Sequence, residues 1–256
     1  MQLSGAVILI TGAARGIGLA LAQRFAIEQP AGLVLSDLAG AALSQAAASC
    51  GGVPIPADVS SESDIQFLIG QTVDRFGRLD LICSNAGILV SGGVEVPDPE
   101  WDRIWRVNLM SHVYIARAYL PELRRQGHGY LLLTVSAAGL LTAPGAAPYA
   151  VTKHAALSLA EWLAVTHAAE GLRVSALCPE FVRTQMVLDV EGPYRDWMVN
   201  AAIPPEAVAE TVVNGLAAED FLILPHPEVA EYFRRKAADY PRWLQGMRRL
   251  LDKVRT

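Results

Sequence analysis

The stretch Val7–Gly18, VILITGAARGIG, decides how the rest of the chain is interpreted. A short apolar run leads into glycines at positions 12, 16 and 18, and a segment of helical periodicity follows at once. Glycines let the backbone turn tightly and approach a ligand closely, and the start of the next helix offers unpaired N–H groups to a phosphate. The pattern predicts a strand, a turn and a helix that bind a pyrophosphate. A plain strand-to-helix connection is the alternative.

The alternation of short apolar runs and helical segments continues along the chain. After the first run, strands are expected at 32–36, 53–57, 79–84, 130–136, 172–178 and 221–224. Helices are expected at 17–28, 39–48, 62–76, 102–120, 149–169 and 205–218. Such alternation implies right-handed crossovers, and therefore an α/β fold with a doubly wound parallel sheet and helices on both faces.

The length of 256 residues suits one large α/β domain, and no repeat or linker marks a second one. We expect the catalytic domain at 1–226, with a substrate loop at 180–204 that contains scattered aromatic residues, and a helical tail at 227–256. The tail has two apolar stripes, one ending before Pro241 and one around Trp243. Either it packs on the chain's own core or it covers the substrate loop of its own or a neighbouring subunit.

Composition and charge narrow the possible partners. The chain is about half hydrophobic and has a net charge of -5, which argues against nucleic acid or an anionic membrane and favours a small apolar molecule. Residues 130–152 carry no formal charge, but glycines and prolines interrupt that stretch, so a buried strand and a loop are expected rather than a membrane span. The widely spaced Cys50, Cys83 and Cys178 predict reduced thiols in a cytoplasmic protein without a metal site.

Asp37 ends the second expected strand, nineteen positions after Gly18. An acid at about this distance binds the adenosine ribose of NAD and repels the 2′-phosphate of NADP. Leu38 supplies no cation for such a phosphate, whereas Arg15 in the glycine turn is a basic residue that could reach one. NAD is therefore the favoured cofactor and NADP the alternative. Asp37 could also serve only as the cap of the next helix.

Six elements in order resemble the short-chain dehydrogenase/reductase family over about residues 5–185. They are TGxxxGxG at Thr11–Gly18, Asp58–Val59, Asn85–Gly87, Asn108, Ser136, and YxxxK at Tyr149–Lys153. The resemblance implies a Rossmann fold and an oxidoreductase whose catalytic residues are Asn108, Ser136, Tyr149 and Lys153. It also implies that Ser136 holds the substrate oxygen, that Lys153 binds the nicotinamide ribose, and that Asn108 positions a water.

Tyr149 and Lys153 lie four residues apart, on one face of a helix. A cation near 4 Å contributes on the order of 4 kcal/mol at an effective dielectric of about 20, which corresponds to about three pK units. We therefore expect Lys153 to lower the pKa of the Tyr149 phenol, which makes Tyr149 a general acid/base.

The resemblance implies a cofactor site made of glycine-turn, strand-end and loop residues. These are Gly12, Arg15, Gly16, Ile17, Gly18, Asp37, Asp58, Val59, Asn85, Ala86, Gly87, Tyr149, Lys153, Pro179, Val182 and Thr184. Asp58 and Val59 would flank the adenine, although Asp58 could be only a turn residue, and Asn85 could be a clasp between strands. Glu180 departs from the glycine common in the family. We expect it to face solvent, and a positive φ there would be costly.

The expected substrate wall is apolar. It comprises Leu89, Val90, Ala137, Ala138, Leu140, Met186 and residues 181–198. We thus expect an NAD-dependent dehydrogenase acting on a hydrophobic or aromatic secondary alcohol or its ketone. An NADP-dependent ketoreductase and a non-catalytic NAD-binding sensor or scaffold are the rivals. The family resemblance also implies a homo-oligomer, a tetramer or a dimer. His112, His128, His154 and His167 are expected on helix surfaces or loops.

Overall fold

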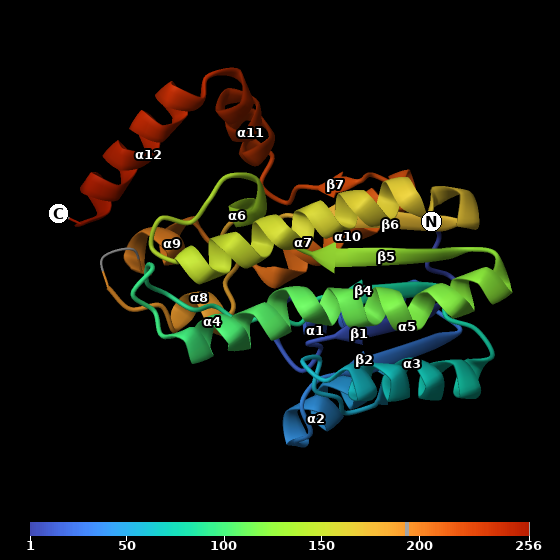
Figure 1. The fold of residues 1–256 in the computed structure, drawn as a ribbon. Helices are drawn as coiled ribbons and strands as arrows, with labels where there is room; N and C mark the ends of the chain where they lie inside the picture. Colours follow the sequence, from blue (N-terminus) through green and yellow to red (C-terminus); the bar gives the residue numbers. More distant parts are fainter. Residues whose placement is uncertain (193–194, 256) are drawn as a thin grey trace.

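The computed structural model, which describes residues 1–192 and 195–255, contains one parallel sheet in the order β3-β2-β1-β4-β5-β6-β7 (Figure 1). The strands are β1 Val7–Thr11, β2 Gly32–Ser36, β3 Val53–Pro54, β4 Leu81–Ser84, β5 Gly129–Thr134, β6 Leu172–Leu177 and β7 Leu222–Ile223. Each expected strand forms, and the doubly wound α/β fold is confirmed. Tyr194, an aromatic residue of the expected substrate loop, lies outside the described residues.

Helices cover both faces of the sheet (Figure 1). The main ones are α1 Gly16–Ile27, α2 Ala41–Cys50, α3 Glu62–Phe76, α7 Ala147–Thr166 and α10 Pro205–Ala218. Side chains alternate across each strand. Ile8 and Ile10 therefore join the core with α1, α2 and α10, whereas Val7 and Leu9 join the core with α3 and α7. The central strands are buried on both faces, as expected for a parallel sheet.

The edge strand β3 is shorter than expected. The strand covers Val53 and Pro54, whereas the sequence predicts a strand over 53–57. Beyond Pro54, the backbone N–H groups of Ile55 and Ala57 still donate to the Leu35 and Asp37 carbonyls. Pro54 and Pro56 have no N–H group to donate to a neighbour, and proline is tolerated in a sheet chiefly at an edge.

The segment expected to form one helix at 102–120 has three parts. They are α4 Asp98–Trp105, the π-helical turn η1 Arg106–Met110, and α5 Ser111–Gln126. Asn108 lies in the middle of the π turn. Such insertions into an α-helix are rare and are frequently found at functional sites.

Short helices form after β5 and β6, where the sequence predicts only loops. They are α6 Ala137–Leu140, α8 Gln185–Leu188 and α9 Arg195–Ala201. The segment expected to be one helix over 149–169 forms α7 followed by the 3-10 turn η2 Ala168–Glu170. The uncharged stretch 130–152 thus comprises most of β5, α6, a loop and the start of α7. None of the helices in the described ranges is both long enough and apolar enough to cross a membrane.

The tail forms two helices, α11 Glu228–Ala238 and α12 Tyr240–Arg255. Val229 is fully buried in the core that also contains α7, and Tyr232 and Trp243 pack against it. Figure 1 shows α11 above α6 and α12 extending outward from the body of the domain. Within one chain, α12 packs mainly on α11.

Candidate active site

The glycine turn between β1 and α1 is too close to its neighbours to accommodate side chains. A Cβ built on Gly18 would lie 2.2 Å from the Gly12 carbonyl oxygen, and one on Gly12 would lie 2.8 Å from Ala86 Cα. Gly12 and Gly16 have φ of 65° and 57°, which glycine adopts without strain. No side chain caps α1 at Arg15, so the first N–H groups of the helix are open to an anion. This cradle fits the pyrophosphate of a dinucleotide, next to Ile17 and Gly18.

Asp37 follows β2 and faces the glycine turn. Its carboxylate accepts hydrogen bonds from the backbone N–H of Ala14, at 3.0 Å, and of Leu38, at 2.8 Å. Helix α2 begins only at Ala41, after Gly40, and has no side-chain cap. The interpretation of Asp37 as a helix cap is therefore wrong. Its carboxylate is beside the turn where an adenosine ribose would be recognised.

Asn85 ties together the carboxyl ends of three strands. Its Nδ2 donates to the Thr11 carbonyl at 3.0 Å, and its Oδ1 accepts from Thr134 Oγ1 at 3.1 Å. The clasp interpretation is confirmed. The Asn85 clasp places Ala86 against the glycine turn and Gly87 beside Asn108 and Lys153.

Asp58 makes a turn rather than standing free. Its Oδ1 accepts from Ser60 N at 2.9 Å and from Ser60 Oγ at 2.8 Å, just before α3. The side chain is nevertheless exposed, while Val59 is buried in the core. Asp58 thus has the turn role, and an adenine contact at Asp58 and Val59 stays a prediction.

Ser136, Tyr149 and Lys153 come together beyond the carboxyl end of β5. Ser136 starts α6 as its N-cap, and its Oγ accepts from Ala138 N at 3.1 Å. Tyr149 and Lys153 project from α7, and Lys153 Nζ lies 5.6 Å from the centre of the Tyr149 ring. The Ser136 side chain is close enough to the Tyr149 hydroxyl to lower its pKa, in opposition to burial. The structure therefore brings together the trio that the sequence predicts.

The expected lowering of the Tyr149 pKa is not found. Burial raises the pKa of Tyr149 above its ordinary value, and the Ser136 side chain opposes this only in part. Lys153 is 3% exposed, and its Nζ donates to the Thr134 carbonyl at 2.8 Å. Burial lowers the pKa of Lys153 to about 8. The expected lowering of the pKa is not found because desolvation of the buried phenol, which opposes the effect of a nearby cation, is the larger effect.

Asn108 is fully buried, and its amide pairs with the Ile88 backbone. Ile88 N donates to Oδ1 and Nδ2 donates to Ile88 O, both at 2.9 Å. The π turn thus fixes the loop after β4, one residue beyond Gly87. Positioning of a water by Asn108 stays a prediction.

Two histidines expected at the surface are buried. His112 is 2% exposed, lies 2.5 Å from Ser84 Oγ through Nδ1, and has no partner for Nε2 within the described structure. Burial, reinforced by the charge of Lys153, lowers the pKa of His112 to about 3, so the ring is neutral. His167 is 7% exposed and pairs with Glu170 at 2.7 Å. The position of a histidine in the sequence does not show whether its side chain faces the sheet or the solvent.

The loop after β6 differs from expectation at Glu180. This residue does not have a positive φ, and its side chain is partly buried rather than facing solvent. Burial, and secondly Glu228, raise the pKa of Glu180. The backbone N–H of Glu180 donates to His226 Nδ1 at 3.1 Å. The Phe181 carbonyl accepts a hydrogen bond from His226 Nε2, also at 3.1 Å. His226, which the sequence analysis missed, therefore connects the start of this loop to the start of the tail.

The rest of the loop lies beside the glycine turn. A Cβ built on Gly16 would be 3.2 Å from Thr184 Cγ2, and Val182 is buried. The Pro179 carbonyl accepts from Ala137 N at 2.8 Å, next to Ser136. Phe181 and Trp197 stack edge to face with their ring centres 4.8 Å apart. Of the expected wall, Val90, Ala137, Ala138 and Leu140 are buried, Leu89 is half-buried, and Met186 is more exposed.

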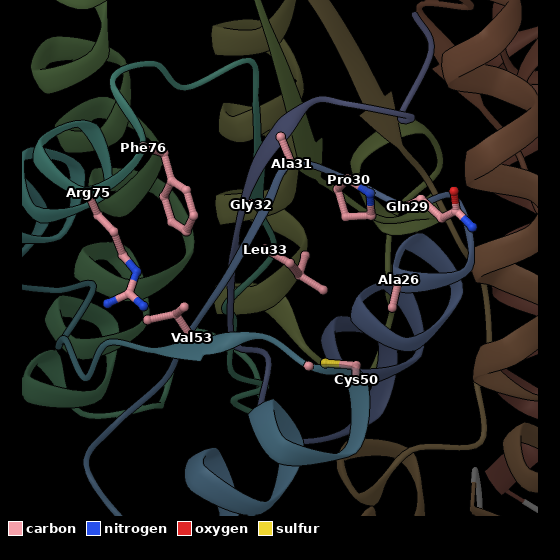
Figure 2. A pocket seen from close by; sticks show the side chains of 11 residues that line it. Ala26, Gln29, Pro30, Ala31, Gly32, Leu33, Cys50, Val53, Arg75 and Phe76 are labelled. Carbon is pink, nitrogen blue, oxygen red and sulfur yellow. The ribbon is translucent and has the colours of Figure 1, made fainter.

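One hollow in the structure lies away from this cluster. It has a volume of about 250 Å³ and lies at the amino ends of β2 and β3, whereas the trio gathers beyond the carboxyl end of β5 (Figure 2). Cys50, Arg75 and Phe76 line it, and burial raises the pKa of the Cys50 thiol. Apart from Cys50 and Arg75, its lining offers no ionisable side chain. In the described ranges, no group of three or more His, Cys, Asp or Glu is arranged to hold a metal ion.

Comparison with known proteins agrees with this geometry. A family model described as short chain dehydrogenase matches residues 6–193. The chain belongs to the short-chain dehydrogenase/reductase family. The chain is therefore an oxidoreductase of this family. That its glycine turn, Asn85 clasp and Ser136–Tyr149–Lys153 cluster form the active site stays a prediction.

Two curated relatives of this chain are named as dehydrogenases, and a similar solved structure is a complex with NAD. A 1-deoxy-11-beta-hydroxypentalenate dehydrogenase of Streptomyces exfoliatus is 34% identical, covering 89% of this chain and 86% of its own. A meso-2,3-butanediol dehydrogenase of Serratia marcescens is 33% identical, and the match covers 86% of this chain and 90% of that protein. A family member from Burkholderia phymatum, solved in complex with NAD, superposes with a TM-score of 0.87 at 26% identity, covering 94% and 96%.

Proposed function

We propose that this protein is an NAD-dependent dehydrogenase that moves a hydride between the nicotinamide and a hydrophobic secondary alcohol or its ketone. The observation that carries the proposal is the cluster of Ser136, Tyr149 and Lys153 at the same sheet edge as an open glycine turn and Asp37. When bound, the nicotinamide would accept or donate the hydride.

The residues of the chain would transfer the proton and position the substrate. Tyr149 Oη takes the alcohol proton during oxidation and returns it during reduction. Ser136 Oγ holds the substrate oxygen beside Tyr149, whose pKa the Ser136 side chain already lowers in part. Lys153 supplies a buried positive charge that favours the phenolate. Burial raises the pKa of Tyr149, and the positive charge of an oxidised nicotinamide would favour loss of its proton.

NAD is proposed over NADP because of Asp37. The next residue, Leu38, is 64% exposed and offers no cation to a 2′-phosphate. The observation that favours NADP is Arg15, an exposed basic residue in the glycine turn. The Burkholderia phymatum structure was solved in complex with NAD, which supports the first choice.

Asp37→Ala is expected to shift cofactor preference toward NADP. Loss of a charged hydrogen-bond acceptor costs about 1.5–3 kcal/mol, so the NAD-to-NADP ratio of kcat/KM falls about 10- to 100-fold. Steady-state kinetics with both cofactors measures it. Asp58→Ala is the matched control, because an adenine contact would affect both cofactors equally. An unchanged ratio in Asp37→Ala would remove Asp37 from cofactor selection.

The substrate is proposed to be apolar because the expected wall is mostly aliphatic and aromatic. The related dehydrogenases from Streptomyces exfoliatus and Serratia marcescens are named for hydroxylated substrates. A panel of secondary alcohols, from small diols to polycyclic alcohols, assayed for NADH formation tests the function. Turnover best with apolar members supports the proposal. Tight NADH binding without any turnover would instead favour a non-catalytic NAD-binding scaffold.

We propose a homo-oligomer, most simply a tetramer or a dimer, in the cytoplasm. Val151, Trp162 and Val165 lie along one face of α7 and are 46%, 56% and 82% exposed, and Trp105 at the end of α4 is 39% exposed. Apolar side chains aligned on neighbouring helices indicate an interface. Light scattering at micromolar concentration is expected to give a multiple of 27.5 kDa. A stable monomer would contradict this prediction.

A further inference from the structure

Lys236 is a buried cation in the tail helix α11. It is 8% exposed, although an amphipathic helix normally leaves a lysine in solvent. Its Nζ donates to the Leu140 carbonyl at 2.7 Å and to the Leu141 carbonyl at 3.1 Å, and lies 3.4 Å from His154 Nε2. The Tyr240 ring, 5.8 Å away, adds a cation–π contact. An ammonium has three hydrogens, and each has an acceptor here.

The His154 tautomer follows from its other contact. Nδ1 lies 2.9 Å from the Ala150 carbonyl, which only accepts, so Nδ1 carries the hydrogen. In the neutral ring Nε2 is then an acceptor directed at Lys236. The side chain that follows Lys153 in sequence is thereby linked to the tail.

The two carbonyls belong to the end of the turn that Ser136 starts. Helix α6 runs over Ala137–Leu140 with Ser136 as N-cap, and its last carbonyls lack partners within the helix. Lys236 supplies those partners. The turn also touches α7 directly, because a Cβ on Gly139 would lie 2.6 Å from the Lys153 carbonyl oxygen. Lys236 thus joins three segments: the tail, the Ser136 turn and the helix of Tyr149.

We propose that Lys236 is a positioning residue for the reaction, and that the C-terminal tail is part of the active-site architecture through it. Lys236 touches neither substrate nor cofactor. It holds the far end of the Ser136 turn against α7, and so fixes Ser136 Oγ relative to Tyr149 Oη. The inference rests on the proposed function, because it assigns Lys236 to that same site.

Lys236→Met keeps most of the side-chain volume and removes all three hydrogen bonds. Small misplacement of a catalytic group can cost up to about 100-fold in rate, so kcat is expected to fall about 10- to 100-fold while KM for NAD stays within about twofold. Arg234→Met is the matched control, since Arg234 lies two positions away, is 75% exposed and pairs only at the surface with Glu231. It is expected to leave kcat unchanged.

A purely structural anchor would behave differently. The assay is run below the melting temperature of the variant, where Lys236→Met is folded. A wild-type kcat under these conditions would overturn the proposal, however much stability the variant has lost. If Lys236→Met does not fold, Lys236→Gln, whose amide still donates to one carbonyl, replaces it, with an intermediate fall in kcat expected. Wild-type kcat in folded Lys236→Gln would also overturn the proposal. A wild-type protein that oxidises no alcohol would instead contradict the proposed function.

A double-mutant cycle with Ser136→Ala tests the route of action. If Lys236 acts through Ser136, Lys236→Met is expected to lower kcat less than about twofold further in the Ser136→Ala background. Full additivity of the two losses would show that Lys236 does not act by positioning Ser136, and would overturn this assignment.

Discussion

Tyr149→Phe is expected to lower kcat about 10²- to 10⁴-fold, the usual contribution of a positioned general acid/base. The change removes one oxygen and little volume, and phenylalanine keeps the ring beside Lys153. NADH affinity is therefore expected to stay within about threefold of wild type, because the loss lies in proton transfer rather than in binding. Steady-state turnover of any alcohol found in the panel, combined with NADH titration, measures both quantities.

Tyr130→Phe is the matched control for this experiment. The Tyr130 hydroxyl pairs with Ser175 Oγ at 2.7 Å inside the sheet, so its loss is expected to reduce stability by about 1 kcal/mol and leave kcat unchanged. A Tyr149→Phe variant that keeps most of its kcat would contradict the assigned mechanism. So would a loss of kcat in Tyr149→Phe that only follows a fall in its melting temperature.

The sequence predicts those features that depend on local pattern and fixed spacing. The strand at 32–36 and the helices at 62–76 and 205–218 have the bounds expected from periodicity alone. The glycine turn could be recognised because the positive φ of Gly12 and Gly16, and the tight space at Gly18, admit few other residues. The pairing of Tyr149 with Lys153 follows from helical geometry.

Features that depend on distant segments could not be predicted in the same way. The raised pKa of Tyr149 and the neutral state of the His112 ring both follow from burial, which local sequence does not show. Glu180 is partly buried near the tail, beside Glu228. Lys236 reads as a surface lysine on an amphipathic helix, and its role depends on carbonyls 95 and 96 positions away.

Gly18→Ala is expected to raise the dissociation constant of NADH at least about tenfold, or about 1.4 kcal/mol. The added Cβ would lie 2.2 Å from the Gly12 carbonyl oxygen and 2.8 Å from Asn85 Nδ2. The first contact is a backbone atom, so no side-chain rotation relieves it, and the glycine turn must move away from α1. Such overpacking also lowers the free energy of unfolding by about 1–3 kcal/mol. Calorimetric NADH titration and thermal unfolding measure the two effects.

Gly70→Ala separates this effect from that of losing any helical glycine. Gly70 lies within α3, and a Cβ there meets nothing within 4 Å. Alanine is a better helix former than glycine, so Gly70→Ala is expected to gain about 0.5–1 kcal/mol of stability and to keep wild-type NADH affinity. The proposed cofactor site predicts opposite stability changes for the two variants and weaker NADH binding for Gly18→Ala alone. If Gly18→Ala is destabilised yet binds NADH as wild type does, the turn has only a packing role, and the dinucleotide binds elsewhere.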